Sequence, residues 1–200
     1  MAKKVLLINP DPVPRVLPPL GISYIAENLK KHGHTPVILD MGFDKEINLQ
    51  GIDFVGITTT TLIYYDSKDM VQQIKAQNPD IPVVLGGVHP SVLPDFALKD
   101  SGCDAVIVGE GEEVMVEIAN GEREAKGVIH APVIRDIDSI PFLTYSYLDI
   151  YRYFNFEGAD RIRWSLKQPS IAMIGTRGCP YSCTFCSSKT LFGRRVRFRS

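Results

Sequence analysis

The chain has 200 residues, of which 44% are hydrophobic, and its formal net charge is −1. This length and composition suit one domain with its own core plus a smaller appendage, and a charge near zero does not indicate a nucleic-acid or membrane partner. No run of 18 apolar residues is present, which excludes a membrane-spanning helix. The apolar run near the N-terminus is too short for a signal peptide, so we expect a cytoplasmic protein that binds neither nucleic acid nor membrane.

The first 40 residues predict a strand, a stiff loop, a helix and a second strand. Val5–Asn9 is a short apolar run that ends in a polar residue, which is typical of a buried parallel strand. Residues 10–19 contain five prolines, which exclude a helix there. From Leu20 onward apolar residues fall at helical spacing, until the cations and glycine of residues 30–33 end the helix. The second strand is expected at Pro36–Asp40.

Residues 54–120 repeat this alternation three times. Strands are expected at Phe54–Thr58, Pro82–Leu85 and Ala105–Val108, and helices at Asp66–Gln77, 92–99 and Glu112–Asn120. Strands that alternate with helices predict a doubly wound α/β fold with a parallel sheet, here five-stranded and formed by residues 1–121.

Residues 122–168 lose the alternation and are expected to form an ordered connector. We expect its aromatic side chains to pack between the neighbouring domains rather than to stack on nucleic-acid bases; they are Phe142, Tyr145, Tyr147, Tyr151, Tyr153, Phe154 and Phe156.

Three of the four cysteines stand close together, in Cys179-Pro-Tyr-Ser-Cys183-Thr-Phe-Cys186. Three thiolates at this spacing can converge on one soft metal centre. A structural zinc site normally uses four ligands, so three ligands favour an iron–sulfur cluster with one iron left open. Cys103 stands alone and is expected to be a small buried residue.

The CxxxCxxC spacing resembles the signature of the radical S-adenosylmethionine enzymes. The resemblance implies that Cys179, Cys183 and Cys186 ligate a [4Fe–4S] cluster, that S-adenosylmethionine binds the open iron, and that Phe185 lies near it through its backbone. Residues 169–200 would then begin a (β/α) barrel, with a strand at 170–175 and the cluster loop at 176–188. Because only fourteen residues follow Cys186, we expect the front part of a longer enzyme, not catalytic by itself.

Small and polar residues follow the predicted strands, where open parallel sheets bind ligands. No GxGxxG follows the first strand and no GxxxxGK[ST] occurs, so neither a dinucleotide site nor a Walker-type phosphate site is expected. Residues 18–21, 33–34, 59–61, 86–91, 94, 108–112 and 134–142 instead resemble the cobalamin-binding domain that precedes many radical S-adenosylmethionine barrels. The resemblance assigns cobalamin contacts to Thr59, Thr60, Thr61, Gly86, Gly87, His89, Pro90, Gly109, Glu110 and Gly111.

The chain departs from the wider cobalamin-binding pattern in one place. Residues 11–15 hold no histidine where corrinoid methyltransferases and mutases carry DxHxxG. By resemblance to the radical enzymes, the nucleotide tail would be swung away from cobalt and would enter the domain past Gly86-Gly87. His89 either contacts the tail or caps its loop, or replaces the missing cobalt ligand. Glu110 and Glu112 could act as a general acid and base. Alternatively, Glu110 holds a loop and Glu112 begins the last helix, where a carboxylate interacts favourably with the helix dipole.

The resemblance implies that the full protein is a cobalamin-dependent radical S-adenosylmethionine enzyme. It would methylate an unactivated carbon or phosphorus centre of a small molecule, or catalyse a related radical cyclisation, with flavodoxin or ferredoxin as electron donor. A methylthiotransferase is disfavoured because its N-terminal domain needs three further cysteines and this one has only Cys103. A non-catalytic corrinoid-binding or cofactor-free α/β module is the remaining alternative.

Overall fold

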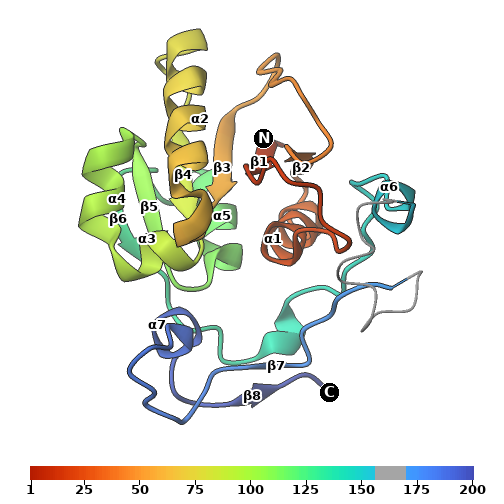
Figure 1. Cartoon of the computed structure of the whole chain (residues 1–200), viewed down its shortest axis with the longest axis vertical. Helices are drawn as coiled ribbons and strands as arrows, with labels where there is room; N and C mark the ends of the chain where they lie inside the picture. Colours follow the sequence, from red (N-terminus) through yellow and green to blue (C-terminus); the bar gives the residue numbers. More distant parts are fainter. Residues whose placement is uncertain (156–169) are drawn as a thin grey trace.

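A computed structural model describes residues 1–155 and 170–200 of the chain. Its centre is a parallel sheet of six strands in the order β2-β1-β3-β4-β5-β6 (Figure 1). The strands are β1 Lys4–Asn9, β2 Thr35–Asp40, β3 Phe54–Thr58, β4 Val83–Gly86, β5 Ala105–Val108 and β6 Gly127–His130. The strand order reverses between β1 and β3, and a ligand crevice is expected outside the carboxyl ends at such a point.

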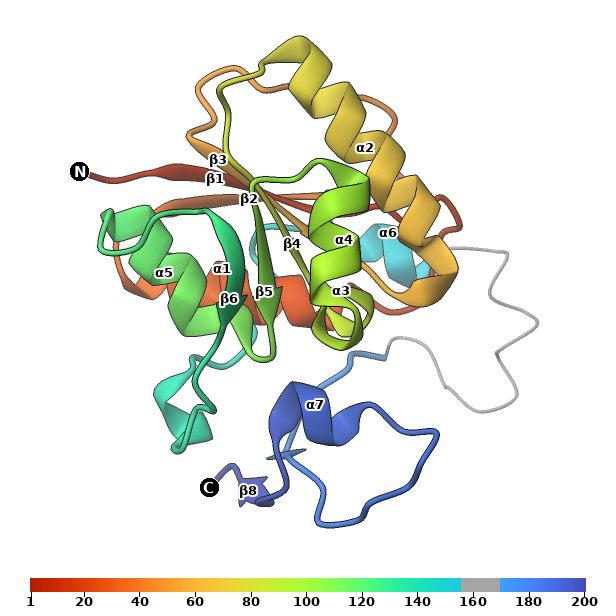
Figure 2. The same ribbon diagram turned by 90° about the vertical axis from the view of Figure 1, so that its left-hand side faces the viewer.

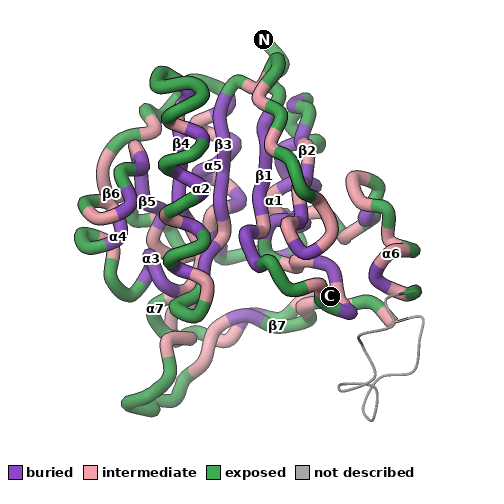
Figure 3. Tube along the Cα trace, turned by 45° about the horizontal axis from the view of Figure 1, so that its top comes forward, coloured by how far each residue is buried: buried purple, intermediate pink, exposed green. Residues whose placement is uncertain are grey.

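Helices cover both faces of the sheet (Figure 2). They are α1 Leu20–Lys31, α2 Tyr64–Gln77, α3 Val88–Val92, α4 Pro94–Ser101 and α5 Gly111–Asn120. Alternate residues of β1 point to opposite faces, so that Leu7 packs with α1 and α5, whereas Leu6 packs with α2 and α4. Burial on both faces explains why the strands are apolar runs, and Figure 3 shows the central strands as mostly buried.

The predicted doubly wound α/β fold is confirmed, with two corrections inside it. The sheet has six strands rather than five, because β6 pairs with β5 from within the expected connector. The helix expected at 92–99 is α4, shifted to Pro94–Ser101, and an unpredicted short helix, α3, precedes it and is separated from it by Leu93. Pro94 follows directly, and the residue before a proline is biased away from helical geometry.

The predicted strand at 170–175 is wrong. At residues 172 and 174 the backbone is bound by side chains instead of by a second strand: the Tyr145 hydroxyl donates to the Ala172 carbonyl at 2.8 Å, and Ile174 N–H donates to the Tyr24 hydroxyl at 3.2 Å. The strand pairing lies further along, where β7 Thr176–Arg177 runs antiparallel to β8 Arg197–Phe198. We name residues 178–196, between these two strands, the cysteine loop; it contains the helix α7 Ser188–Phe192.

Polar contacts hold the connector against β2 and α1. The Tyr153 hydroxyl, in α6 Tyr151–Phe154, donates to Asp40 at 2.7 Å, and Tyr147 donates to Glu27 at 2.9 Å. Tyr145 and Tyr153 are buried, whereas Phe142 and Tyr151 are mostly exposed. The connector also contains the short η2 helix Ile137–Ser139, and Phe156 lies outside the described residues. None of the helices in the described part of the chain is long and apolar enough to cross a membrane.

Candidate functional site

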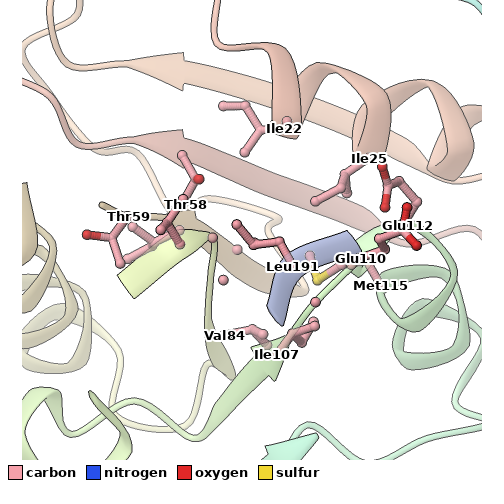
Figure 4. A pocket seen from close by; sticks show the side chains of 18 of the residues that line it. Ile22, Ile25, Thr58, Thr59, Val84, Ile107, Glu110, Glu112, Met115 and Leu191 are labelled. Carbon is pink, nitrogen blue, oxygen red and sulfur yellow. The ribbon is translucent and has the colours of Figure 1, made fainter. Parts of the chain in front are cut away.

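A pocket of about 270 Å³ opens at the carboxyl ends of β1, β3, β4 and β5 (Figure 4). Its floor is apolar, and Leu7, Val84, Ile107 and Met115 form it from the sheet and from α5. Helix α1 supplies Gly21, Ile22 and Ile25 to one wall. A slot between a sheet and two helices suits a flat, largely apolar group.

Six glycines line this pocket, and two of them are adjacent but have different roles. Gly86 has open space where a Cβ would stand, so its missing side chain leaves room in the pocket. Gly87 has φ +100° and ψ −163°, a conformation that other residues rarely adopt. A Cβ on Gly87 would meet the Thr59 carbonyl oxygen at 2.7 Å. Gly86 therefore widens the pocket, and Gly87 allows the loops after β3 and β4 to approach each other closely. The other four glycines are Gly21, Gly56, Gly109 and Gly111.

Most of the predicted cobalamin contacts come together around this pocket. Gly86, Gly87, Gly109, Gly111 and Glu110 line it, as do Thr59 and Thr60. Thr58, which sequence reasoning did not single out as a contact, also lines it, from the last position of β3. The polar groups lie at the strand ends while the floor is apolar, so an amphipathic ligand would place its apolar part deepest.

Thr61, His89 and Pro90 are not among the lining residues. His89 is buried in α3, where its ring lies 4.2 Å from the Tyr64 ring and its Nδ1 lies 3.2 Å from the Thr61 hydroxyl. Its Nε2 has no hydrogen-bond partner among the described residues. Burial lowers the pKa of His89. These contacts with Thr61 and Tyr64 place His89 in the packing between α3 and α2, behind the pocket wall.

Glu110 and Glu112 are joined in a buried network to two arginines from the C-terminal segment. Arg177 donates to Glu110 at 2.8 Å and to Glu112 at 2.6 Å, and Arg197 donates to Glu110 at 2.7 Å. Burial disfavours the charged form of Arg177, but the two glutamates more than offset this and raise its pKa. Carboxylates occupied by guanidinium groups suit a structural role better than proton transfer.

The same C-terminal segment completes the pocket wall. Leu191 and Phe192, in α7 of the cysteine loop, line the pocket, and Figure 4 shows the Leu191 side chain projecting from α7 into it. The Arg197 guanidinium donates to the Phe192 carbonyl at 2.7 Å and fixes the end of α7. Sequence reasoning missed this wall, because nothing in residues 188–192 marks them as neighbours of β3 or β5.

Cys179, Cys183 and Cys186 lie around one small hollow together with Tyr181, Ser188 and Lys189. Cys183 and Cys186 are exposed and Cys179 is half-buried. Hydrogen bonds from the Ser188 backbone and hydroxyl lower the pKa of Cys186, which favours the thiolate that binds metals. Within residues 1–155 and 170–200, no three His, Cys, Asp or Glu side chains are close enough to form a metal site. The structure therefore gathers the three thiols on one loop without closing them around a centre.

Two further residues singled out in the sequence, Cys103 and Phe185, differ from each other in burial. Cys103 is buried and its thiol donates to the Ala105 carbonyl at 3.3 Å, as expected of a core cysteine. Burial raises its pKa, which leaves it unreactive. Phe185, the predicted neighbour of S-adenosylmethionine, is 91% exposed between Cys183 and Cys186.

Comparison with known proteins bears directly on the pocket. The family described as "B12 binding domain" matches residues 10–119, the segment that contributes α1, β3, β4, β5 and α5 to it. The chain belongs to the B12-binding domain family. The match stops short of β6 and of the cysteine loop, so it covers the pocket except for β1 and the wall formed by α7.

Relatives of this B12-binding domain chain carry enzyme names. It is 31% identical to an uncharacterised methyltransferase of Pyrococcus horikoshii, over 98% of this chain and 48% of that protein. It is 30% identical to an anaerobic magnesium-protoporphyrin IX monomethyl ester cyclase of Rubrivivax gelatinosus, over 91% of this chain and 37% of the cyclase. The chain thus spans about half or less of the length of these relatives.

A solved structure shares the fold over the whole chain. The radical S-adenosylmethionine methyltransferase TsrM of Kitasatospora setae, solved with a tryptophan substrate and an S-adenosylmethionine analogue bound, superposes with a TM-score of 0.73. The superposition covers 100% of this chain and 43% of TsrM at 18% sequence identity. At this identity the likeness shows the fold and says nothing about substrate.

Proposed function

We propose that this chain binds cobalamin, with the nucleotide tail of the cofactor in the 270 Å³ pocket. One observation carries the proposal: the pocket is a glycine-lined apolar slot at the carboxyl ends of the strands of a B12-binding domain. Its volume lies just below the range of pockets that take whole drug-sized molecules. It suits the flat tail of the cofactor and is too small for the corrin ring.

The residues present fit this tail in their chemistry. Gly86 and Gly87 leave the mouth open, Val84 and Met115 give an apolar floor, and the Thr58 hydroxyl at the rim can donate or accept a hydrogen bond. No histidine lies among the lining residues. We therefore expect bound cobalamin without a nitrogen ligand from this pocket.

We further propose that Cys179, Cys183 and Cys186 hold a [4Fe–4S] cluster that binds S-adenosylmethionine, with Phe185 beside it. The three thiols share one hollow, and soft thiolates suit iron–sulfur clusters. In the whole protein, cobalamin would supply methyl transfer, and the cluster would supply the electron that generates a hydrogen-abstracting radical from S-adenosylmethionine. The names of the relatives support a methyltransferase or cyclase. We propose that it acts on a small molecule and that a flavodoxin or ferredoxin supplies its electrons.

The role of the chain's own residues follows from this arrangement. The glycine-lined slot orients one end of the cofactor, and the apolar floor excludes water from it. The cysteine loop supplies both the thiolates and the wall residue Leu191. The two cofactor sites are thus formed partly by the same stretch of chain.

Cobalamin binding is tested by incubating the chain with hydroxocobalamin, desalting it and recording the visible spectrum. Cobinamide, which lacks the nucleotide tail, is the matched ligand control. We expect retention of cobalamin but not of cobinamide, with a spectrum that shows no nitrogen coordination. Equal retention of both would contradict the assignment of the tail to the pocket, and a histidine-ligated spectrum would direct attention to His89.

A variant series tests the site itself. Gly86→Phe places an aromatic ring in the open space of the pocket and should abolish retention, whereas Gly86→Ala should reduce it little. Gly175→Phe adds the same ring at an exposed glycine outside the pocket and should bind as wild type. For the cluster, anaerobic reconstitution should give a reducible iron–sulfur absorbance that Cys183→Ala lacks. An intact cluster in that variant would refute the ligand assignment.

A further inference from the structure

Both ends of the cysteine loop are attached to a single carboxylate. Arg177 directly precedes the loop and donates to Glu110 Oε1 at 2.8 Å. Arg197 directly follows it and donates to Glu110 Oε2 at 2.7 Å. The second oxygen also accepts from Ile134 N–H at 3.0 Å. Each oxygen of Glu110 therefore fixes one end of the segment that carries all three clustered cysteines.

The network is balanced in charge and almost completely removed from water. The side chains of Arg177 and Arg197 are each 4% exposed, that of Glu110 is 1% exposed and that of Glu112 is 7% exposed. Two arginines and two glutamates cancel in charge. Well-packed apolar residues in place of this network would often give the fold equal or greater stability. Paired guanidinium and carboxylate groups differ in that their hydrogen bonds are directional. The contacts therefore define the position and orientation of the loop.

The same glutamate belongs to the pocket. Glu110 lines it between Gly109 and Gly111, at the start of α5. The carbonyl oxygen of Leu191 would lie 3.5 Å from a Cβ on Gly109, so the loop backbone passes close to this rim. Arg197 also donates to the Phe192 carbonyl. A ligand that shifts the rim of the pocket therefore acts on both ends of the cysteine loop at once.

We infer that Glu110 is a positioning residue that couples ligand binding in the pocket to metal binding by the cysteine loop. The inference rests on the proposed function and adds a linkage between its two sites. If the cluster-loaded loop favours the rim geometry that binds cobalamin, each ligand tightens the binding of the other by the same factor. The linkage passes through the Glu110 carboxylate and its two arginines.

The test is a thermodynamic cycle on the full chain. The dissociation constant of hydroxocobalamin is measured anaerobically before and after cluster reconstitution in wild type, Glu110→Gln and Glu117→Gln. Glu117 is the matched control, since it is a glutamate of α5 whose ion pair with Arg123 lies outside the network. We expect reconstitution to tighten binding at least about five-fold in wild type and Glu117→Gln, and to leave the affinity of Glu110→Gln unchanged. Because Glu110 also lines the pocket, the affinity of Glu110→Gln for hydroxocobalamin alone is measured separately, and only the ratio of its dissociation constants before and after reconstitution tests the coupling.

The outcomes separate this inference from the proposed function. A wild-type chain that binds both ligands without coupling overturns the inference, as does a Glu110→Gln chain that retains the coupling. A folded wild-type chain that binds no cobalamin overturns the proposed function. In that case amide hydrogen exchange still tests the positioning role: Glu110→Gln should lose protection across residues 178–196, whereas unchanged protection would overturn it. If Glu110→Gln does not fold, Arg197→Gln replaces it, because it keeps the Arg177 contacts and frees only the far end.

Discussion

Replacing Gly87 by alanine should destabilise the chain strongly, although the change adds one methyl group. Gly87 holds φ +100° and ψ −163° between β4 and α3. The added Cβ would lie 2.7 Å from the Thr59 carbonyl oxygen and 3.1 Å from the Thr58 hydroxyl oxygen. The nearer contact is with backbone, which cannot rotate away.

The expected loss follows from two terms. A residue other than glycine in this region of φ and ψ costs about 1–3 kcal/mol, and the steric overlap adds an overpacking cost of about 1–3 kcal/mol. We therefore expect Gly87→Ala to lower the free energy of unfolding by about 2–6 kcal/mol. Because domains are stable by only about 5–15 kcal/mol, this is a large fraction of the total.

The neighbouring Gly86→Ala change is the internal control. Its Cβ meets nothing within 4 Å, and its φ is not in the left-handed region. Alanine there also restricts the unfolded chain, so its stability should lie within about 1 kcal/mol of wild type. Urea unfolding of the three proteins, with unchanged m-values, measures the difference. Equal stability of the two variants would refute the assignment of strain to Gly87.

Three further changes test other parts of the structure. Tyr153→Phe removes the buried hydroxyl that donates to Asp40 and should lower the free energy of unfolding by about 1.5–3 kcal/mol, as measured in urea. Burial lowers the pKa of His89 below its ordinary value of 6.5, so the unfolded chain binds the proton more readily and stability should fall as the pH drops below 6.5. His89→Gln should flatten that part of the curve of unfolding midpoint against pH. Gly178 has φ +93° and its Cβ would overlap the Arg195 carbonyl, so Gly178→Ala should prevent iron–sulfur loading, measured as bound iron, while the far-ultraviolet circular dichroism stays native.

The strands β1 to β5 could be predicted because each is a continuous apolar run. Val5–Ile8 is buried from end to end, and burial of both faces leaves this signal in the sequence. β6 was not predicted because its apolar part is only Val128-Ile129, and His130 at its end is exposed. Pairing with β5 makes it a strand, and that partner lies about twenty residues away along the chain.

The strand predicted at 170–175 failed for the opposite reason. Ile171, Met173 and Ile174 give an apolar pattern, but an apolar run forms a strand only where another backbone pairs with it. Tyr24 and Tyr145 take up its polar groups instead, from α1 and from the connector. Ile171 and Met173 remain more than half exposed.

The contacts at the candidate site could be predicted only where they depend on local conformation. Gly86, Gly87 and Gly109 could be predicted as ligand contacts because they stand at the carboxyl ends of β4 and β5, and all three line the pocket. Their contact with cobalamin stays a prediction. Glu110 was identified as well, but its partners were not. Arg177 and Arg197 stand 67 and 87 residues further along the chain.

A carboxylate beside a ligand pocket can move protons, bind the ligand or hold another segment, and the sequence around Glu110 is the same in each case. Its exposure and its partners decide among these roles. The Glu110 side chain is 1% exposed and meets a guanidinium group on each oxygen. An acid or base needs a free oxygen within reach of the reacting group, and here both are occupied. The Glu110 carboxylate is thus better suited to hold the cysteine loop against the pocket rim than to act on a ligand inside it.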